Sequence, residues 1–410
     1  MTRYLEAMSK IRLLSFLTAF LLLFCLTPGI SSAAKGQPQD DGLSGVREGW
    51  AWPVVVVSPP EGWESPRGRS VKAAMRAAER EISTQRDAIR GREVTFMFSS
   101  VSQPAELKER LTTWRAMGVR VIVSFGGGEM DDVLLSLCSS KGPAVVFAGG
   151  EDLAVIDGVT GAANPYLFAL DLPYFARANA LAEVAAAERP PKGVAVMTDM
   201  MSAKLAKGAG LSTGFLTSRG ISAVDMSVTA YRQDQFNSQV RNAEAWGVEI
   251  FTCWLDAMAT LSIWRTIHIS SRTSAVYYAG NQHRILLDAE GLILVDKEVL
   301  LARNEEGRRL LEIKVRDILN IGPEDHVIAA KAFALAKWVI SAHIKTASDG
   351  MLPLARALSD VSEIPLMDEN ISIDPRTHRP VSRGFGVLRI ENREFRSFGR
   401  VEVFSSEVSE

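Results

Sequence analysis

The residues best placed to do chemistry follow the ends of two apolar stretches. Gly126, Gly127 and Gly128 come directly after VIVSF, and Gly150 with Glu151 closes PAVVFAGG. If these stretches are strands of a parallel sheet, their carboxyl ends are where ligands bind. Glycine lets a ligand approach the main chain, and N–H groups at a helix N-terminus attract anions. The pattern indicates a ligand loop, with a tight turn without a ligand, or a helix-start carboxylate at Glu151, as the alternatives.

The sequence has no complete nucleotide-binding motif, and its one catalytic motif lies in the wrong structural context. Gly126 and Gly128 begin a G-x-G-x-x-G pattern, but Asp131 stands in place of its last glycine, and no Gly-Lys is followed by Ser or Thr. GLSTG around Ser212 matches a nucleophile elbow, yet the residues before it are typical of a helix where that motif needs a strand. The five histidines form no pair at metal-ligand spacing. We therefore expect no catalytic residue, no metal and no cofactor.

The elements that position these loops alternate along the chain. Apolar runs typical of buried strands cover residues 53–58, 93–99, 119–125, 143–150, 193–199, 221–228 and 248–254. Stretches with helical spacing lie between them, and the first has Ser65 as its N-cap and Pro66 at the first helical position. This alternation predicts parallel sheets with right-handed crossovers.

Two segments of the chain resemble each other. TWRAMGVRVIVSFGGG and AEAWGVEIFTCWLDA each contain a helix end with a Trp, then Gly-Val, a strand and a short loop. The likeness predicts two similar α/β lobes. Residues 326–344 are apolar but interrupted by Lys331 and Lys337, which favours a buried lobe helix over a membrane span. From Ile371 onward, short strands and turns are expected.

The composition and the N-terminal segment limit the classes of function that this chain can have. The chain has 410 residues, 47% of them apolar, and a formal charge of −2, so it offers no electrostatic footprint for nucleic acid. Residues 1–34 have a basic start, the apolar run LLSFLTAFLLLFCL and small residues before their end, which is typical of a signal peptide. We expect export with cleavage after Ala34, followed by a polar linker over 35–49, with an uncleaved membrane anchor as the alternative. After cleavage, no stable membrane anchor is expected. Cys138 and Cys253 are then expected to be buried free thiols.

Pieces spread over most of the chain resemble the type I periplasmic binding proteins, in particular the branched-chain amino-acid and amide binding group of ABC importers. The pieces are SPRGRSVKAAMRAAEREI, GREVTFMFSSVSQPAELKERL, NPYLFALDLPYFARANALAEVA, RQDQFNSQVRNAEAWGVEIF and IDPRTHRPV. The resemblance implies an α/β fold of two Rossmann-like lobes with parallel sheets, joined by three crossings around a hinged cleft. Lobe 1 would comprise residues 50–171 and 296–365, and lobe 2 residues 172–295 and 366–410.

The resemblance also assigns ligand-binding residues. In this family the loops after the third and fourth strands hold the ligand, often through its carboxylate, and here they contain Gly127, Gly128, Gly150 and Glu151. The position at which the family has an acidic residue for the ligand's ammonium corresponds to Gly280 or Asn281 in this chain. This chain departs from the family where glycines replace hydroxyl residues, where Ala203 replaces an aromatic residue, and where Arg67 replaces another.

Four further residues complete the hypothetical site. Arg67 is a fixed cation suited to an anionic ligand such as a carboxylate, unless it is a surface arginine on a helix. Trp63 and Trp254 fall at the edges of the expected cleft, where they would stack on an aromatic ligand, or they are packing residues. Asp256 follows the strand that ends at Trp254, and it would be the polar contact from lobe 2.

The function that these patterns favour is an exported, periplasmic solute-binding protein. It would capture a small molecule, such as a carboxylate or an amino-acid-like ligand, by lobe closure and deliver it to the membrane permease of an ABC importer, without doing chemistry. A ligand-sensing receptor that presents its closed form to a signalling partner has the same fold and stays open as an alternative. An exported α/β hydrolase that uses Ser212 is the third possibility.

Overall fold

The computed structural model describes most of the chain after residue 50. The described residues are 51–83, 93–101, 103–150, 153, 155, 162–171, 173–187, 192–229, 232–269, 274–280, 284–296, 305–319, 325–346, 350–362, 364–365, 370–381 and 385–401. The expected signal peptide and linker therefore lie outside the described residues, as do Glu151 and Asn281 of the hypothetical site.

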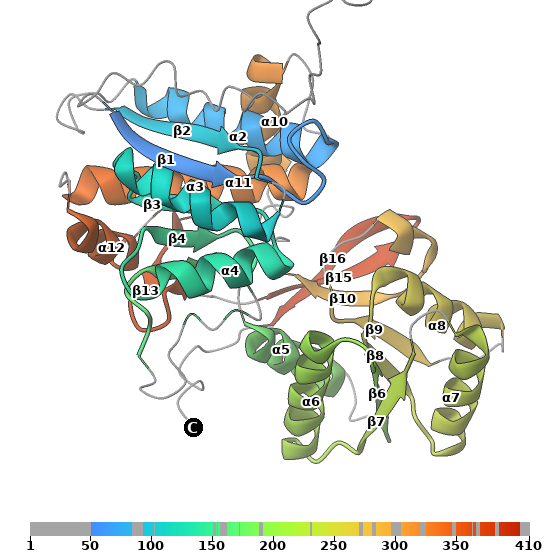
Figure 1. Ribbon diagram of the computed structural model, residues 1–410. Helices are drawn as coiled ribbons and strands as arrows, with labels where there is room; N and C mark the ends of the chain where they lie inside the picture. Colours follow the sequence, from blue (N-terminus) through green and yellow to red (C-terminus); the bar gives the residue numbers. More distant parts are fainter. Residues whose placement is uncertain are drawn as a thin grey trace, which may run out of the picture. The chain divides into compact units, whose positions relative to one another are not determined.

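The first sheet has five parallel strands in the order β2-β1-β3-β4-β5 (Figure 1). They are β1 (Ala51–Val57), β2 (Glu93–Ser99), β3 (Val121–Ser124), β4 (Ala144–Phe147) and β5 (Leu167–Ala169). The short apolar runs predict the first four of these strands correctly. The three-residue β5 was missed, because its stretch is too short to show a period.

The second sheet has seven strands in the order β16-β15-β10-β9-β8-β6-β7. They are β6 (Val194–Asp199), β7 (Ala223–Val228), β8 (Ile250–Trp254), β9 (Ala275–Tyr278), β10 (Ile293–Asp296), β15 (Phe385–Glu391) and β16 (Glu394–Val401). Strands β6 to β10 are parallel, whereas β15 and β16 form an antiparallel hairpin at the edge. The predicted two-lobe α/β architecture is confirmed.

Helices connect these strands on both faces of each sheet. They are α2 (Pro66–Ser83), α3 (Pro104–Ala116), α4 (Gly128–Cys138), α5 (Tyr174–Ala187), α6 (Ala203–Ser218), α7 (Gln233–Ala245), α8 (Ala257–Ile269), the 3-10 helix η3 (Arg284–Asp288), α10 (Glu305–Leu319), α11 (His326–Thr346) and α12 (Met351–Ser359). Two small ribbons follow, β11 (Ile364–Pro365) with β12 (Asn370–Ile371) and β13 (Ile373–Asp374) with β14 (Arg379–Pro380). Ser65 caps α2 as predicted, because its Oγ accepts a hydrogen bond from the Gly68 N–H at 3.0 Å.

The chain passes between the two sheets three times: after β5, after β10 and before β15. The last passage lies later than expected. The sequence placed the return to lobe 2 at residue 366, but the second sheet resumes only at Phe385. Ile373 packs in the core of the first lobe, and the Ala169 N–H of β5 donates to the His378 carbonyl. These long-range contacts, which no local pattern reveals, keep residues 373–380 with the first sheet.

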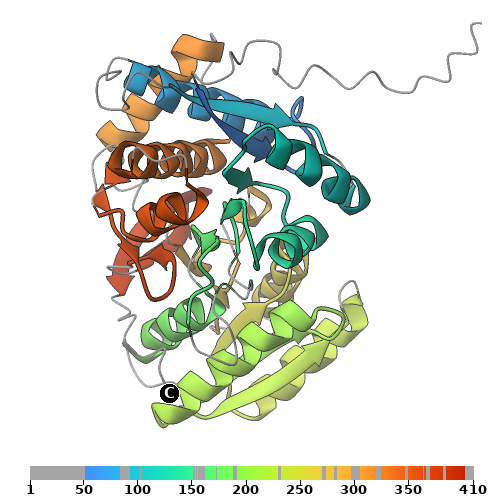
Figure 2. The ribbon, with the colours of Figure 1, turned by 60° about the vertical axis from the view of Figure 1, so that its left-hand side comes forward.

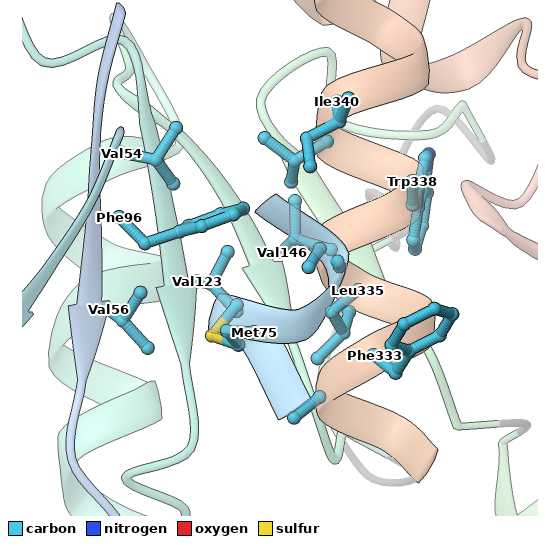
Figure 3. Close-up of a cluster of buried hydrophobic side chains, with 14 of the residues drawn as sticks. Val54, Val56, Met75, Phe96, Val123, Val146, Phe333, Leu335, Trp338 and Ile340 are labelled. Carbon is cyan, nitrogen blue, oxygen red and sulfur yellow. The ribbon is translucent and has the colours of Figure 1, made fainter. Parts of the chain in front are cut away.

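Helices cover both faces of each sheet, although β7 and β16 at the edges of the second sheet keep several exposed residues. On the first sheet, α2 and α11 cover one face and α3 and α4 the other (Figure 1). Alternate strand residues therefore point to different cores: Val54, Val56 and Val123 meet Met75 and the α11 side chains (Figure 3). The second sheet has α5 and α6 on one face and α7 and α8 on the other. Near-continuous apolar runs are typical of such doubly covered parallel strands.

Helix α11 is the central helix of lobe 1 and lies alongside α2 (Figure 2). Within the described residues, Val327–Thr346 is the one helix long and apolar enough to cross a membrane by length and composition. Most of its apolar side chains are buried inside the lobe, and Trp338 donates its indole N–H to the Leu358 carbonyl at 2.9 Å. Lys331 and Lys337, which interrupt the apolar run, pair with Asp171 and Glu81. The expectation of a buried lobe helix is confirmed.

The two similar segments of the sequence form equivalent structures. After α3 and after α7 the chain turns through Gly118 (φ +82°) and Gly247 (φ +78°), a backbone conformation that favours glycine at a helix end. The tryptophans differ, since Trp114 is buried whereas Trp246 is exposed. Cys138 and Cys253 are both free and buried, as expected. Burial raises the pKa of both thiols, that of Cys138 to about 12.

The close packing of α6 on β8 requires glycine at position 208, and this requirement can be tested. A Cβ atom on Gly208 would overlap the ring of Trp254, which is 1% exposed and donates its indole N–H to Ser212 Oγ at 2.8 Å. Gly208→Ala should therefore lower the free energy of unfolding by about 1–3 kcal/mol, as overpacking does. Gly210→Ala is the matched control in the same helix, with no atom within 4 Å of the new methyl group. It should gain about 0.5–1 kcal/mol. Urea unfolding measures both, and equal effects of the two substitutions would refute this packing.

Candidate functional site

The strand order defines where a ligand site is expected in each lobe. In the first sheet the order reverses between β1 and β3, and in the second sheet between β6 and β8. In open α/β sheets, ligands bind beyond the carboxyl ends of the strands at such a reversal. In lobe 1 the loops at this place are residues 58–65 and 125–127. In lobe 2 they are residues 200–202 and 255–256.

The loop after β3 consists of the three glycines. Gly126 is buried, and a Cβ there would overlap the side chain of Met130. Gly127 (φ +63°) and Gly128 (φ +49°) are exposed, and a Cβ on either would meet no atom within 4 Å. Their positive φ angles explain why glycine stands there. The turn presents bare backbone to solvent at the start of α4.

A buried pair of side chains supports this turn from below. Ser124 Oγ donates a hydrogen bond to Asp131 Oδ1, and it accepts one from the Gly126 N–H at 3.3 Å. Asp131 is 4% exposed and, with Glu129, places two acidic residues in the first turn of α4. Negative charge there is stabilised by the helix dipole. Sequence reasoning missed both residues of the pair, although Asp131 was noticed as the residue that breaks the glycine motif.

The loop after β4 lies beside the first, since Ser124 of β3 pairs with Phe147 of β4. Gly150 has φ +101°, and a Cβ there would crowd Leu153 and Ala169. Its carbonyl accepts a hydrogen bond from the Arg379 guanidinium at 2.7 Å. Gly150 is thus held in one orientation by a residue of the β13–β14 ribbon.

The backbone N–H groups of these two loops have no partner in the part of the chain that the structure describes. None of the hydrogen bonds among the described residues uses the N–H of Gly127, Gly128, Gly149 or Gly150. Backbone polar groups in folded proteins usually have a partner, either in the protein or in water. Four such donors at two adjacent strand ends form a place where a ligand acceptor can bind.

Arg379 joins the loop after β4 to the first passage between the sheets. It is 5% exposed and donates to the carbonyls of Asp171, Gly150 and Leu153. Its neighbour His378 stacks on Phe168, with ring centroids 4.4 Å apart, and burial lowers the pKa of its imidazole. The ribbon therefore fixes the loop through a buried cation. The turn IDPRTHRPV marked this region in the sequence, but not the role of Arg379.

Arg67 lies in the first turn of α2, after the β1 loop. Its Nη1 is 3.0 Å from Glu61 Oε1 and its Nε is 3.5 Å from Asp325 Oδ2. Asp325 Oδ1 also accepts the Ile328 N–H of α11. The guanidinium is half exposed, but two carboxylates balance its charge. This arrangement favours the surface-arginine interpretation over the anion-binding hypothesis.

Trp63 and Trp254 both pack within their own lobes. Trp63 is 7% exposed, donates its indole N–H to the Ser99 carbonyl at 2.9 Å and meets Phe98 edge to face. Trp254 is 1% exposed and lies between Gly208, Ser212 and Tyr174. Neither ring face is open to a ligand, so the packing alternative describes both.

Asp256 caps α8, because its Oδ1 accepts the Ala259 N–H at 2.7 Å. It lies at the expected strand end of lobe 2, next to the reversal of strand order. Its position thus agrees with the hypothesis that it contacts the ligand, but its carboxylate already has a structural role. Ser212 lies inside α6 and is 1% exposed. It therefore does not stand on the strand-to-helix turn that a nucleophile elbow requires.

The structure thus gathers Gly127, Gly128 and Gly150 at one sheet edge and places Asp256 at the corresponding edge of the other lobe. Arg67 is near the first edge but paired, and the two tryptophans are below the surface. Within the described residues, no group of three or more His, Cys, Asp or Glu side chains could hold a metal ion.

No protein-family model and no curated protein matches the sequence. Solved structures do match. The leucine-binding protein LivK of Thermotoga maritima aligns with a TM-score of 0.67 at 14% identity, over 87% of this chain and 100% of that one. A putative branched-chain amino acid ABC transporter protein of Rhodospirillum rubrum gives 0.70 at 14% identity, over 85% and 100%.

A third similar structure is a solute-binding protein of an ABC transporter from R. palustris, in complex with benzoate. It has a TM-score of 0.64 at 14% identity, over 87% of this chain and 98% of that one. At these identities the likeness concerns the fold. The resemblance seen in the sequence is therefore confirmed for the fold. The chain has the two-lobed α/β fold of the type I periplasmic binding proteins, like the substrate-binding proteins of branched-chain amino acid ABC transporters.

Proposed function

We propose that this protein is an exported solute-binding protein that captures a small molecule between its lobes and delivers it to an ABC importer. The observation that carries the proposal is the set of N–H groups on Gly127, Gly128, Gly149 and Gly150, at the ends of β3 and β4, which have no hydrogen-bond partner among the described residues. Similar structures are described as solute-binding proteins in complex with leucine or benzoate. The signal-like residues 1–34 support export.

The ligand must offer a hydrogen-bond acceptor to the glycine loops. The R. palustris and Desulfitobacterium hafniense proteins bind benzoate and leucine, both of which carry a carboxylate. In this chain, however, Glu129 and Asp131 occupy the first turn of α4, and Arg67 is paired with two carboxylates. Like charges near a site oppose a further anion. These charges favour a neutral acceptor, such as an amide carbonyl, over a carboxylate.

Capture by closure requires contacts from both lobes, because a ligand shifts a conformational equilibrium only through its different affinities for the two states. In lobe 1 the contacts would come from the glycine loops. In lobe 2 they would come from the loops that follow β6 and β8, where Asp256 lies. A ligand that contacts one lobe alone would bind without driving closure.

A thermal-melt panel of matched pairs tests the function and the acceptor together. We would compare benzamide with benzoate and leucinamide with leucine, and add succinate as a polar dicarboxylate. A ligand at one hundred times its dissociation constant should add about 2.7 kcal/mol to the free energy of unfolding, which a melt detects. We expect the larger shift from the amide of each pair. A larger shift from the acids would contradict the neutral acceptor, and no shift with any compound would contradict solute binding.

Arg67 provides a second test. If its role is to link the β1 loop and α11, Arg67→Ala should cost about 0.5 kcal/mol of stability, which is typical of exposed ion pairs. The affinity for the best ligand of the panel should stay within about twofold, a change of roughly 0.4 kcal/mol. Titration calorimetry on the variant measures that affinity. A tenfold loss confined to carboxylate ligands would instead restore Arg67 as an anion-binding residue.

A further inference from the structure

Arg379 lies where three segments of lobe 1 meet. It is buried, and its guanidinium donates hydrogen bonds to the Gly150 carbonyl at 2.7 Å, to the Leu153 carbonyl at 3.1 Å and to the Asp171 carbonyl. Gly150 and Leu153 belong to the loop after β4, whereas Asp171 follows β5. One side chain therefore joins a candidate ligand loop to the point at which the chain first leaves lobe 1.

Asp171 is the lobe 1 end of the first passage between the sheets, and two cations hold it. Its backbone carbonyl accepts a hydrogen bond from Arg379, and its Oδ2 is 2.9 Å from Nζ of Lys331 on α11. The two side chains of this ion pair are 11% and 12% exposed. Breaking a buried pair leaves an uncompensated charge, which is strongly destabilising. The start of the first passage is therefore fixed to the body of lobe 1.

The first passage is also short. Tyr174 opens α5 and packs edge to face on Trp254 in the core of lobe 2, so only Leu172 and Pro173 separate Asp171 from the second lobe. The ring of Pro173 fixes its own φ angle, which leaves this link few free torsions. A displacement of Asp171 is therefore transmitted to α5.

The last passage starts from the same place. Arg379 lies in β14, and the Ala169 N–H of β5 donates to the carbonyl of its neighbour His378 at 3.2 Å. The chain enters β15 of the second sheet soon afterwards. The lobe 1 ends of the first and last passages are thus held together by the β14 backbone and by the guanidinium of Arg379.

Gly150 connects this junction to the candidate site. Its N–H has no partner among the described residues, whereas its carbonyl is held by Arg379. A ligand acceptor that binds the N–H therefore acts on a residue whose other polar group is bonded to the junction. Chains of hydrogen-bonded groups of this kind carry energetic coupling between separate places in a protein.

We propose that Arg379 is a positioning residue that couples occupancy of the loop after β4 to the first and last passages between the lobes. The inference rests on the proposed function and adds the route by which binding in lobe 1 acts on the passages. Arginine suits this role because its planar fork presents several donors in a fixed geometry, whereas lysine is a point charge on a flexible stem. Arg379 itself does not touch the bound molecule.

Three single substitutions test the coupling. Arg379→Lys keeps the charge and removes the fork. Arg376→Lys is the matched control, because Arg376 lies in the turn of the same ribbon with 78% of its side chain exposed. Lys337→Gln is the stability control, because it breaks an ion pair with Glu81 that joins α11 to α2.

The probes are benzamide, benzoate, leucinamide and leucine. Calorimetry measures their affinities, and hydrogen exchange measures the protection of residues 148–150, 171–177 and 376–381. With the probe that the wild-type protein binds most tightly, exchange should slow in all three segments.

Arg379→Lys should weaken binding of that probe by about five- to tenfold, which is within the usual range of coupling free energies. At saturating probe it should keep the slower exchange at 148–150 but lose it at 171–177. Arg376→Lys and Lys337→Gln should keep the wild-type exchange pattern and an affinity within about twofold, a change of roughly 0.4 kcal/mol. Lys337→Gln should nevertheless melt at a lower temperature than the wild type.

The outcomes separate the coupling from solute binding. Unchanged affinity in Arg379→Lys, or slower exchange at 171–177 that persists in it, would overturn the coupling and leave solute binding in place. The same losses in Lys337→Gln would also overturn it, because lower stability would then explain them. If Arg379→Lys does not fold, the wild-type protein decides, since slower exchange confined to the glycine loops would refute the coupling. Absence of binding by all four probes would overturn the proposed function and this inference with it.

Discussion

The parallel pairing of β1 with β3, and of β6 with β8, is the constraint on which the rest of the structure depends. Where two neighbouring strands send their connections to opposite faces of a sheet, the loops beyond their carboxyl ends leave space for a ligand. Both lobes contain this reversal, with the same order of their first five strands. The chemistry of each edge then follows from the few residues that end those strands.

The two edges are supported from beneath by buried polar contacts. Ser124 and Asp131 hold the glycine turn, and Arg379 holds Gly150 through its carbonyl. In lobe 2, Trp254 fills the space that Gly208 leaves, and Ser212 accepts its indole N–H. Binding sites are accurate when such supporting contacts fix the groups that meet the ligand. The polar and charged side chains near these edges thus serve as support, while the bare backbone of Gly127 and Gly128 is left at the surface.

The sequence predicted those parts of the fold that local patterns encode. Apolar runs located most parallel strands, Ser65 and Pro66 marked the start of α2, and the repeated Trp-Gly-Val segments indicated two lobes. The glycine loops could be predicted because the end of a strand is visible in the sequence itself, where an apolar run gives way to glycines. The environment of Arg67 and Trp254 was not readable, because Asp325 and Ser212 come from distant parts of the chain.

The most direct test of the central claim is hydrogen exchange with and without the compound that raises the melting temperature most. If the ligand binds at the strand ends, exchange should slow in peptides that cover Gly127–Gly128, Gly149–Gly150 and Met200–Met201. The strands themselves should change little, because their amides are already paired. Slower exchange only in other parts of the chain, with these three loops unaffected, would contradict the claim that both sheet edges form the ligand site.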